Sequence, residues 1–533
     1  MKKILLLFAS FYEKKDLPEK KRIFWEPLGM AYLAAYLREH GYYVDILYPL
    51  IEDMDEKNII TWLKDKVNDY MMIGLSTSDF SVSDVKKYVT IIRKIQYTGY
   101  IFLGGMGPTC KWREFVMTGV DAVIIGEGEK TILNVAQMVE NNLDYKCVSG
   151  LAYLKNGEPY RNGKVKLIEN LDENVFPARD ISLRFLEKFD INQIHIQIQT
   201  SRGCFGDCSF CSISKFLNEQ GGNRYRCRTA ESIVKEMIFL NSKYGFNKFD
   251  FMDENFFPFD KEKSIEKGMA LAEEMKKLSC NVELFVQCHL QAISNELLNI
   301  LKSMNVTNIF VGIDSFQSSE LFLFNKRYCR EDVFGFLSLI QNSSYSFDVK
   351  SKYRIKTGFI NFTPISTLDT LYENGVIFKK YNFSCKKLIR KLRVNSSNST
   401  LVDKIYSLFS DFSIDNYFMN KEVEHFYTSL VKFYNEYESI RGNMRNIENM
   451  YINDSNVCLI TDIQKVVSIR EAIDDLFYEF YFCKIKEIKD SVDYGSLSIR
   501  NRLLSLEEKA NYISRKVLYI DNSVSYPIND RGV

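Results

Sequence analysis

Three cysteines, Cys204, Cys208 and Cys211, stand within eight residues of the 533-residue chain, directly after a strand-like run. Three thiolates on one short loop can hold three corners of a [4Fe–4S] cluster, and the fourth iron then has no protein ligand from that loop. An open metal position usually means that chemistry takes place there. Gly203 and Gly206 allow the backbone to wrap closely around such a cluster.

The other nine of the twelve cysteines are scattered singly along the chain. A disulfide framework would be unusual in so large a chain, so metal binding or catalysis is favoured. The alternative for the loop is a structural zinc site with Cys227 as the nearest fourth ligand. Zinc sites usually combine two paired Cys-x-x-Cys segments. The second pair is missing here, so the pattern favours the cluster.

The composition argues against several classes of protein. Lys plus Arg total 70 against 69 for Asp plus Glu, so the net charge of +1 favours neither nucleic acid nor an anionic membrane. The apolar runs are far shorter than the ~20 residues of a membrane span. The first residues lack the pattern of a signal peptide, so we expect a cytoplasmic location. The length predicts three or four domains of about 150 residues each.

Residues 1–145 alternate short apolar runs with amphipathic stretches, which predicts a parallel α/β sheet covered by helices. Small residues follow three of the strands, at Ser76-Thr77, Gly104-Gly105 and Gly126-Glu127-Gly128. Open α/β sheets bind ligands at the carboxyl ends of their strands, so this edge is a candidate ligand site. The expected strands are 3–10, 43–48, 71–77, 99–104 and 121–126, and the expected helices are 27–40, 56–68, 82–96 and 111–118.

Residues 146–190 are rich in turn signals and are expected to be a connector. A second α/β run follows over residues 191–382. Its five strand signals suit a partial (β/α)6 barrel better than a closed eight-stranded barrel, which typically needs ~250 residues. The expected strands are 193–199, 248–252, 282–287, 308–313 and 354–362, and the expected helices are 229–244, 262–278, 295–304 and 331–341.

Residues 383–533 have a different character, because glycine is sparse and apolar residues recur at helical spacing, as in 423–437 and 469–485. We expect an α-helical C-terminal domain here. Residues 395–399 (Asn-Ser-Ser-Asn-Ser) are expected to be a linker, and the chain after Val517 a frayed tail.

The cysteine loop carries the signature Cys-x-x-x-Cys-x-x-Cys with an aromatic residue, Phe210, directly before the last cysteine. This signature resembles that of radical S-adenosylmethionine (SAM) enzymes. Three later segments are similar to the same family: 226–236 resembles its first barrel helix, 249–256 its second strand with an acidic end, and 312–315 its fourth strand. The resemblance covers about residues 193–362.

This resemblance implies that the three cysteines of the loop ligate a [4Fe–4S] cluster, and that its open iron binds the amino and carboxylate groups of SAM. It places Asp253 and Glu254 as acceptors for the methionine amino group, and Gly312 and Asp314 beside the sugar or methionine moiety. One-electron reduction of the cluster, by a reductant such as flavodoxin or ferredoxin, would cleave SAM and release a 5′-deoxyadenosyl radical.

The first domain resembles the cobalamin-binding domain found ahead of the barrel in one large branch of this family, and both the resemblance and the pattern imply a flavodoxin-like (Rossmann-type) fold. The matching segments are 25–33, 73–76, 104–109 and 126–129. The Asp-x-His-x-x-Gly motif of methionine-synthase-type domains is absent, since none of the four histidines stands in it. A vestigial domain without ligand is the alternative. The implied cobalamin contacts are Ser76, Thr77, Ser78, Gly104, Gly105 and Gly126.

The two resemblances together imply methyl transfer to a poorly activated carbon or phosphorus of a small-molecule or peptide substrate in a biosynthetic pathway. A rival hypothesis keeps the radical step without methylation, as in a cyclisation, rearrangement or oxidation. A methylthiotransferase is disfavoured, because only Cys110 and Cys147 precede the barrel and no second cluster can be built from them. A third hypothesis is not an enzyme at all: a zinc-containing binding or scaffold protein.

Overall fold

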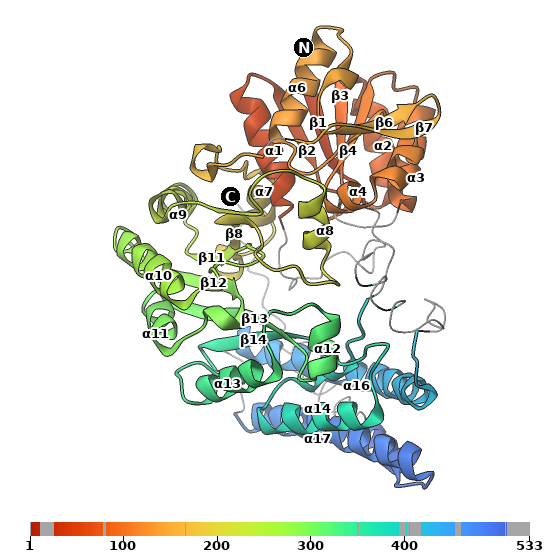
Figure 1. The fold of residues 1–533 in the computed structure, drawn as a ribbon, viewed down its shortest axis with the longest axis vertical. Helices are drawn as coiled ribbons and strands as arrows, with labels where there is room; N and C mark the ends of the chain where they lie inside the picture. The colour runs from red at the N-terminus through yellow and green to blue at the C-terminus, as the bar shows by residue number, and fades with distance from the viewer. Residues whose placement is uncertain are drawn as a thin grey trace, which may run out of the picture.

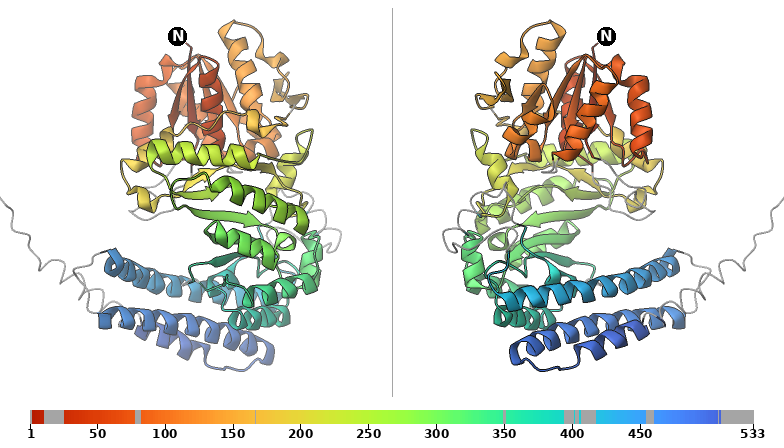
Figure 2. Two further views of the ribbon diagram at one scale, coloured as in Figure 1. Left: turned by 90° about the vertical axis from the view of Figure 1, so that its left-hand side faces the viewer. Right: turned by 90° about the vertical axis from the view of Figure 1, so that its right-hand side faces the viewer.

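The computed structural model describes residues 2–10, 26–77, 82–165, 167–348, 351–393, 401, 405, 417–453, 460–506 and 508. Three parts follow one another along the long axis of the molecule: an α/β domain, a half-barrel and a helical region (Figures 1 and 2). Ser78, the expected linker 395–399 and the expected tail after Val517 lie outside the described residues.

Seven strands form the sheet of the first part, in the order β2-β1-β3-β4-β5-β6-β7. Strands β1 to β5 are parallel, and β6 and β7 extend the sheet in the antiparallel sense. The order 2-1-3-4-5 is that of flavodoxin-like sheets, so the predicted fold is confirmed. The strands are β1 (Lys3–Phe8), β2 (Tyr43–Leu47), β3 (Met72–Ser76), β4 (Tyr100–Gly104), β5 (Ala122–Ile124), β6 (Leu151–Lys155) and β7 (Glu158–Asn162).

Helices cover both faces of this sheet, which explains the nearly continuous apolar run in β1. Ile4 and Leu6 pack into the core on one face, whereas Leu5 and Leu7 pack into a separate core on the other. The helices are α1 (Leu28–Glu39), α2 (Glu56–Lys66), α3 (Ser83–Lys94), α4 (Met106–Cys110), α5 (Trp112–Phe115) and α6 (Glu129–Glu140). The sequence patterns did not predict α4 or α6.

Residues 146–190, predicted as a connector, are more structured than expected. They contribute the hairpin β6–β7 to the first sheet and a short helix, α7 (Asp180–Leu186). The hairpin completes the sheet because Ala152 pairs with Val123 of β5. We therefore propose that the first domain extends to the end of β7 and that the connector begins after it.

The second part is a half-barrel built on a five-stranded parallel sheet in the order β14-β13-β12-β11-β8. A sixth extended segment pairs only by a single parallel bridge, from Lys391 to Phe362 just beyond β14. The predicted partial (β/α)6 barrel is thus present among the described residues with its last strand reduced to that bridge. The strands are β8 (Ile196–Ile198), β11 (Lys248–Phe251), β12 (Glu283–Cys288), β13 (Val306–Asp314) and β14 (Arg354–Phe359).

The helices of the half-barrel pack outside this sheet, and a two-stranded ribbon flanks the cysteine loop. The helices are α8 (Ser212–Asn218), α9 (Ala230–Tyr244), α10 (Lys261–Met275), α11 (Asn295–Ser303), α12 (Ser318–Leu323), α13 (Arg330–Gln341) and α14 (Leu368–Lys380), and the ribbon is β9 (Ser201–Gly203) with β10 (Tyr225–Cys227).

The helical region consists of two long helices, α16 (Lys421–Asn453) and α17 (Ile460–Asp490), followed by a helical stretch at 496–506. The two long helices run across the long axis of the molecule (Figure 2). They are held together by aromatic residues, such as Phe433 and Phe480 with stacked rings 4.0 Å apart. The predicted helical C-terminal domain is confirmed. Among the described residues, no helix is both long and apolar enough to cross a membrane.

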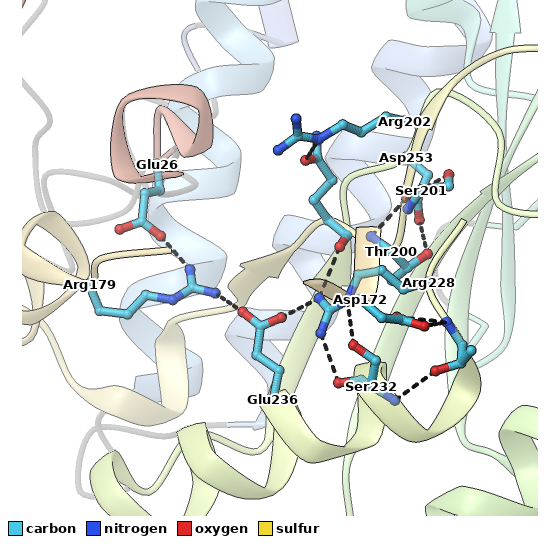
Figure 3. Close-up of polar contacts among 12 residues, drawn as sticks. Glu26, Asp172, Arg179, Thr200, Ser201, Arg202, Arg228, Ser232, Glu236 and Asp253 are labelled. Carbon is cyan, nitrogen blue, oxygen red and sulfur yellow. Dashed lines mark hydrogen bonds and ion pairs between the residues drawn. The ribbon is translucent and has the colours of Figure 1, made fainter. Parts of the chain in front are cut away.

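A buried ion network joins the first part to the half-barrel (Figure 3). Arg179, which precedes α7, donates to Glu26, two residues before α1 (2.6 Å), and to Glu236 of α9 (2.8 Å). Glu236 also pairs with Arg228. The side chain of Arg179 is only 3% exposed, so the network fixes the two parts against each other without access of water.

We predict that Arg179→Met lowers the stability of the protein strongly, because the carboxylates of Glu26 and Glu236 stay buried with one cation fewer. Removing one partner of a buried pair costs about 3–5 kcal/mol, and a fall of this size in the free energy of unfolding should appear in chemical denaturation. Lys276→Met is the control, since it removes only the exposed pair with Glu273. Equal denaturation midpoints for Arg179→Met and the wild type would contradict the prediction.

Candidate functional site

A cavity of about 300 Å³ lies at the carboxyl ends of the strands of the first sheet. Four of the residues predicted to contact cobalamin line it: Ser76, Gly104, Gly105 and Gly126. Thr77 lines an adjoining cavity of about 410 Å³, which shares Ser76 and Gly105 with the first. The structure thus brings the predicted cobalamin residues together, with the exception of Ser78, which lies outside the described residues.

Two of the glycines at this edge are required by the backbone. Gly105 has a φ of +113°, and a Cβ there would lie 2.2 Å from the carbonyl oxygen of Thr77. Gly126 has a φ of +79°, and a Cβ there would lie 2.5 Å from the side chain of Gln220. Since only glycine adopts such a φ without strain, Gly105 lets the end of β4 approach the backbone of Thr77, and Gly126 lets Gln220 of the second part approach closely.

The opposite wall of the first cavity comes from the half-barrel. It includes Gln199, Arg202 and Gly203 at the start of the cysteine loop, and Phe216 and Leu217 of α8 just after it. One cavity is therefore shared between the ligand edge of the first sheet and the residues that flank the cysteine loop on both sides.

Arg202 connects these two walls directly. Its guanidinium donates to Glu129, the first residue of α6 (2.6 Å), and lies 3.3 Å from a carboxylate oxygen of Glu127 in the loop that follows β5. Glu127 also pairs with Arg226 of β10. The guanidinium of Arg202 lies over the ring of Tyr32, 5.0 Å from its centre. The residue two positions before Cys204 is thereby anchored in the first domain.

The cysteine loop is wrapped around Gly206. The Gly206 N–H donates to the Sγ of Cys204 (3.3 Å). A Cβ on Gly206 would lie 3.5 Å from the Sγ of Cys204 and 3.7 Å from that of Cys208. The third thiol, Cys211, stands at the N-terminus of α8 and accepts from the backbone N–H groups there. All three thiols are partly buried.

The electrostatics of the loop suit a cationic cluster core. Burial raises the pKa of Cys211 to about 11, and it also raises the pKa of Cys204. The neighbouring thiols of the loop raise both values further, because thiolates placed close together repel one another. Iron ions would offset this repulsion, so the residues present fit a [4Fe–4S] cluster. Within the described ranges, no three His, Cys, Asp or Glu side chains converge at the spacing needed by a single metal ion.

The far side of the loop is docked on the end of α12. Ser209 donates from its backbone N–H to the carbonyl of Phe324 (3.0 Å) and from its hydroxyl to that of Leu323 (2.7 Å). The side-chain amide of Asn325 donates to the carbonyl of Asp207 (2.8 Å). The loop is therefore held from both sides, by the first domain and by the half-barrel.

Asp253 and Glu254 were both predicted to bind the SAM amino group, and they lie in different environments. The Asp253 carboxylate accepts hydrogen bonds from the backbone N–H groups and the hydroxyls of Thr200 and Ser201 (Figure 3). It is buried and holds the chain where it enters the cysteine loop. Glu254 instead lines both cavities. Burial, with a smaller effect of Asp253, raises its pKa to about 7.

Gly312 and Asp314 were predicted beside SAM, and the structure places them at the end of β13. The carboxylate of Asp314 forms an ion pair with Lys326, whose side chain is 6% exposed. Lys326 lies close enough to Cys208 for the thiolate to contribute, after Asp314, to raising the pKa of the ammonium. The Tyr328 hydroxyl, 2.8 Å from the carbonyl oxygen of Gly312, fixes the backbone there.

Sequence reasoning missed Arg202 and Lys326. Arg202 directly precedes the loop in the chain, and this position was the only available signal. Lys326 stands more than a hundred residues away in a polar stretch, and nothing in its neighbourhood distinguishes it from a surface lysine. Its position beside Asp314 and the cysteine loop depends on the packing of α12.

Comparison with known proteins identifies two domains. Residues 22–136 match the B12 binding domain family, and residues 198–351 match the radical SAM superfamily. An uncharacterized methyltransferase of Pyrococcus horikoshii is 27% identical over 294 residues, which are 54% of this chain and 61% of that protein. An anaerobic magnesium-protoporphyrin IX monomethyl ester cyclase of Rubrivivax gelatinosus is 25% identical over 320 residues, 57% of this chain and 54% of that one. The matches thus span less than two thirds of these relatives.

Solved structures support the same fold. The structure of the cobalamin-dependent SAM radical enzyme OxsB with aqua-cobalamin bound aligns with 98% of this chain and 80% of its own, with a TM-score of 0.71 at 15% sequence identity. This likeness covers nearly the whole chain and confirms the predicted fold class. The chain therefore carries a B12-binding domain at residues 22–136 ahead of a radical SAM domain at residues 198–351, which confirms the predicted resemblance to radical SAM enzymes with a cobalamin-binding domain.

Proposed function

We propose that this protein is a cobalamin-dependent radical SAM enzyme that transfers a methyl group to an unactivated carbon or phosphorus of a biosynthetic intermediate. The observation that carries the proposal is the shared cavity, because the glycine-lined edge of the B12-binding domain and the start of the cysteine loop face the same space. Two cofactors bound there would act on one substrate.

In this proposal Cys204, Cys208 and Cys211 hold a [4Fe–4S] cluster, and Gly206 leaves room for it between the thiols. When bound, the cluster and SAM supply a 5′-deoxyadenosyl radical, and cobalamin supplies a transferable methyl group. Glu254 accepts a hydrogen bond from the methionine amino group of SAM, since it is the carboxylate that lines both cavities. Asp253 acts through the loop, as a positioning residue.

The cobalamin side of the proposal rests on Ser76, Gly104, Gly105 and Gly126. Side chains are small or absent at these positions, so a flat macrocycle can approach the sheet edge. None of the four histidines lines the cavity, so cobalamin would bind without an imidazole from this chain on its lower face. The electron for SAM cleavage would come from a protein reductant such as flavodoxin or ferredoxin, and the substrate would be a small molecule or peptide.

A second candidate function is a radical reaction without methylation, such as ring formation. It is favoured by the similarity to the magnesium-protoporphyrin cyclase, which extends over 320 residues at 25% identity, against 294 residues at 27% identity for the methyltransferase. The two candidates use the same site and differ in their products from SAM. Methyl transfer yields S-adenosylhomocysteine in addition to 5′-deoxyadenosine, whereas the radical step alone yields no S-adenosylhomocysteine.

We predict about four irons and one cobalt per chain in protein purified without oxygen from cobalamin-fed cells. Metal analysis and the visible spectrum of the protein measure the iron and the cobalt. Iron without cobalt would contradict the cobalamin proposal and favour the second candidate. A colourless protein containing zinc would contradict both.

Cys208→Ala is expected to abolish reductive SAM cleavage, measured as 5′-deoxyadenosine formation with dithionite, because one iron loses its ligand. The variant should keep the far-UV circular dichroism and the cobalamin content of the wild type. Cys147→Ala is the matched control, since this cysteine is exposed in the first domain, and it should cleave SAM normally. Full activity of Cys208→Ala would refute the cluster assignment.

We expect SAM binding to weaken at low pH, because the carboxylic acid of Glu254 has a raised pKa of about 7 and is neutral below it. If the carboxylate form is needed, the dissociation constant should rise about tenfold per pH unit below that value. Anaerobic equilibrium binding between pH 5.5 and 7.5 measures it. Glu254→Gln should bind more weakly, without this pH dependence. The same pH profile in both proteins would exclude the role of Glu254.

A further inference from the structure

Lys326 is a buried cation beside the cysteine loop. Its side chain is almost fully buried, and its ammonium forms an ion pair with the carboxylate of Asp314 at the end of β13. The ammonium also lies 5.3 Å from the centre of the Phe210 ring and 5.7 Å from that of the Tyr328 ring. Because Phe210 directly precedes the third cysteine of the loop, this positive charge lies against the loop itself.

The position of Lys326 follows from the chain that precedes it. Residues 323–325 run beside residues 207–209 of the loop and form with them the hydrogen bonds described above. The ring of Phe324 also meets the ring of Phe210 edge-on, with 5.1 Å between the ring centres. Lys326 is the next residue of the chain, so its side chain starts from a backbone that is already fixed on the loop.

Asp314 holds the ammonium from the side of the sheet. Its carboxylate lies over the ends of β13 and β14, because a Cβ on Gly312 or on Gly358 would lie 3.2 Å from one of its oxygens. The backbone of Asp314 has a φ of +61°, which is uncommon for a residue other than glycine. The Tyr328 hydroxyl fixes this part of the backbone, since it lies 2.8 Å from the carbonyl oxygens of both Gly312 and Ile313. The fold thus maintains an unusual backbone conformation at the residue that pairs with Lys326.

The ammonium is the end of this ion pair that acts on the thiols. Burial raises the pKa of Cys204, the charges of Cys208 and Glu254 raise it further, and the charge of Lys326 lowers it. Burial disfavours the charged form of Lys326, but Asp314 and, less strongly, the Cys208 thiolate raise the pKa of the ammonium well above its usual value. The cation is therefore permanent, and the loop experiences mainly the positive end of the pair.

A charge fixed beside the loop acts differently on the two oxidation states of a cluster held there. Reduction adds one negative charge to a [4Fe–4S] cluster, and the local charge and the solvent exposure are among the factors that set its reduction potential. A buried cation stabilises the reduced form, and salt screens a buried charge much less than an exposed one. Lys326 should therefore make the cluster easier to reduce, and the carboxylate of Asp314 should oppose this effect.

We propose that Lys326 and Asp314 together set the reduction potential of the cluster, with the ammonium raising the potential and the carboxylate lowering it. The pair thus determines how readily the cluster accepts the electron that starts the reaction. The proposal rests on the cluster of the proposed function but not on methyl transfer. A purely structural role of the pair would not shift the potential in opposite directions when one or the other charge is removed.

Redox titration of the cluster tests this role. The full-length protein, purified anaerobically with its cluster and kept free of SAM, is poised at a series of potentials, and the reduced cluster is measured by electron paramagnetic resonance. Lys326→Met should lower the ratio of reduced to oxidised cluster at a given potential about tenfold, a shift of about 59 mV for one electron. Asp314→Asn should raise this ratio at least about threefold, and Lys326→Arg should stay within about twofold of the wild type.

Lys276→Met is the matched control, because it removes an exposed lysine of the half-barrel with its ion pair to Glu273, and the potential should not change. Each variant is compared at equal iron content. If Lys326→Met does not hold its cluster, Asp314→Asn decides alone, and an unchanged or lower potential in that variant overturns the proposal. It is also overturned if Lys326→Met leaves the potential unchanged or raises it, or if Lys326→Arg lowers it as much as Lys326→Met.

The titration also separates this proposal from the proposed function, because it needs neither SAM nor substrate. Potentials that shift as expected, in a protein that forms no S-adenosylhomocysteine, would overturn methyl transfer and support the role of the pair. Unchanged potentials in a protein that methylates its substrate would overturn only the role of Lys326 and Asp314. A wild type without an iron cluster would overturn both.

Discussion

The contact of Arg202 with Glu127 and Glu129, which lie between the end of β5 and the first turn of α6, is the interaction on which the rest of the site depends. Arg202 lies two residues before the first cysteine, and its guanidinium is held by Glu127 and Glu129 of the B12-binding domain. The cysteine loop therefore takes its position from a domain that is distant in the sequence. Because these side chains are almost fully buried, the pairs are little screened by salt.

The second buried ion network, around Arg179, also joins the first domain to the half-barrel through Glu26 and Glu236. Buried ion pairs contribute little net stability, because desolvation offsets the attraction between the charges. They are sensitive to geometry, however, since a displaced partner leaves a buried charge uncompensated. We infer that the two networks mainly select one orientation of the domains, the one in which the glycine edge and the cysteine loop share a cavity.

Much of the fold could be predicted from the sequence, because the apolar periodicity reflects burial directly. Five strands of each sheet and most of their helices lie where the pattern placed them. The hairpin β6–β7 was missed because its second strand, with Pro159 and Tyr160, is an edge strand with little apolar alternation. In the site, the small residues at the strand ends were found, whereas the environments of Asp253 and Glu254, adjacent in the chain, could not be told apart.

The sequence by itself determined the local features: the cysteine loop at the end of a strand, the glycines at the ligand edge and the two α/β repeats. These are set by spacing and residue type within a short segment. Only the tertiary structure decided that the Asp253 carboxylate binds Thr200 and Ser201 at the start of the loop, and that Lys326 pairs with Asp314. Each of these contacts joins side chains from strands and loops that are far apart in the chain. Such long-range hydrogen bonds and burial produce no periodic pattern in the sequence, so they could not be predicted from it.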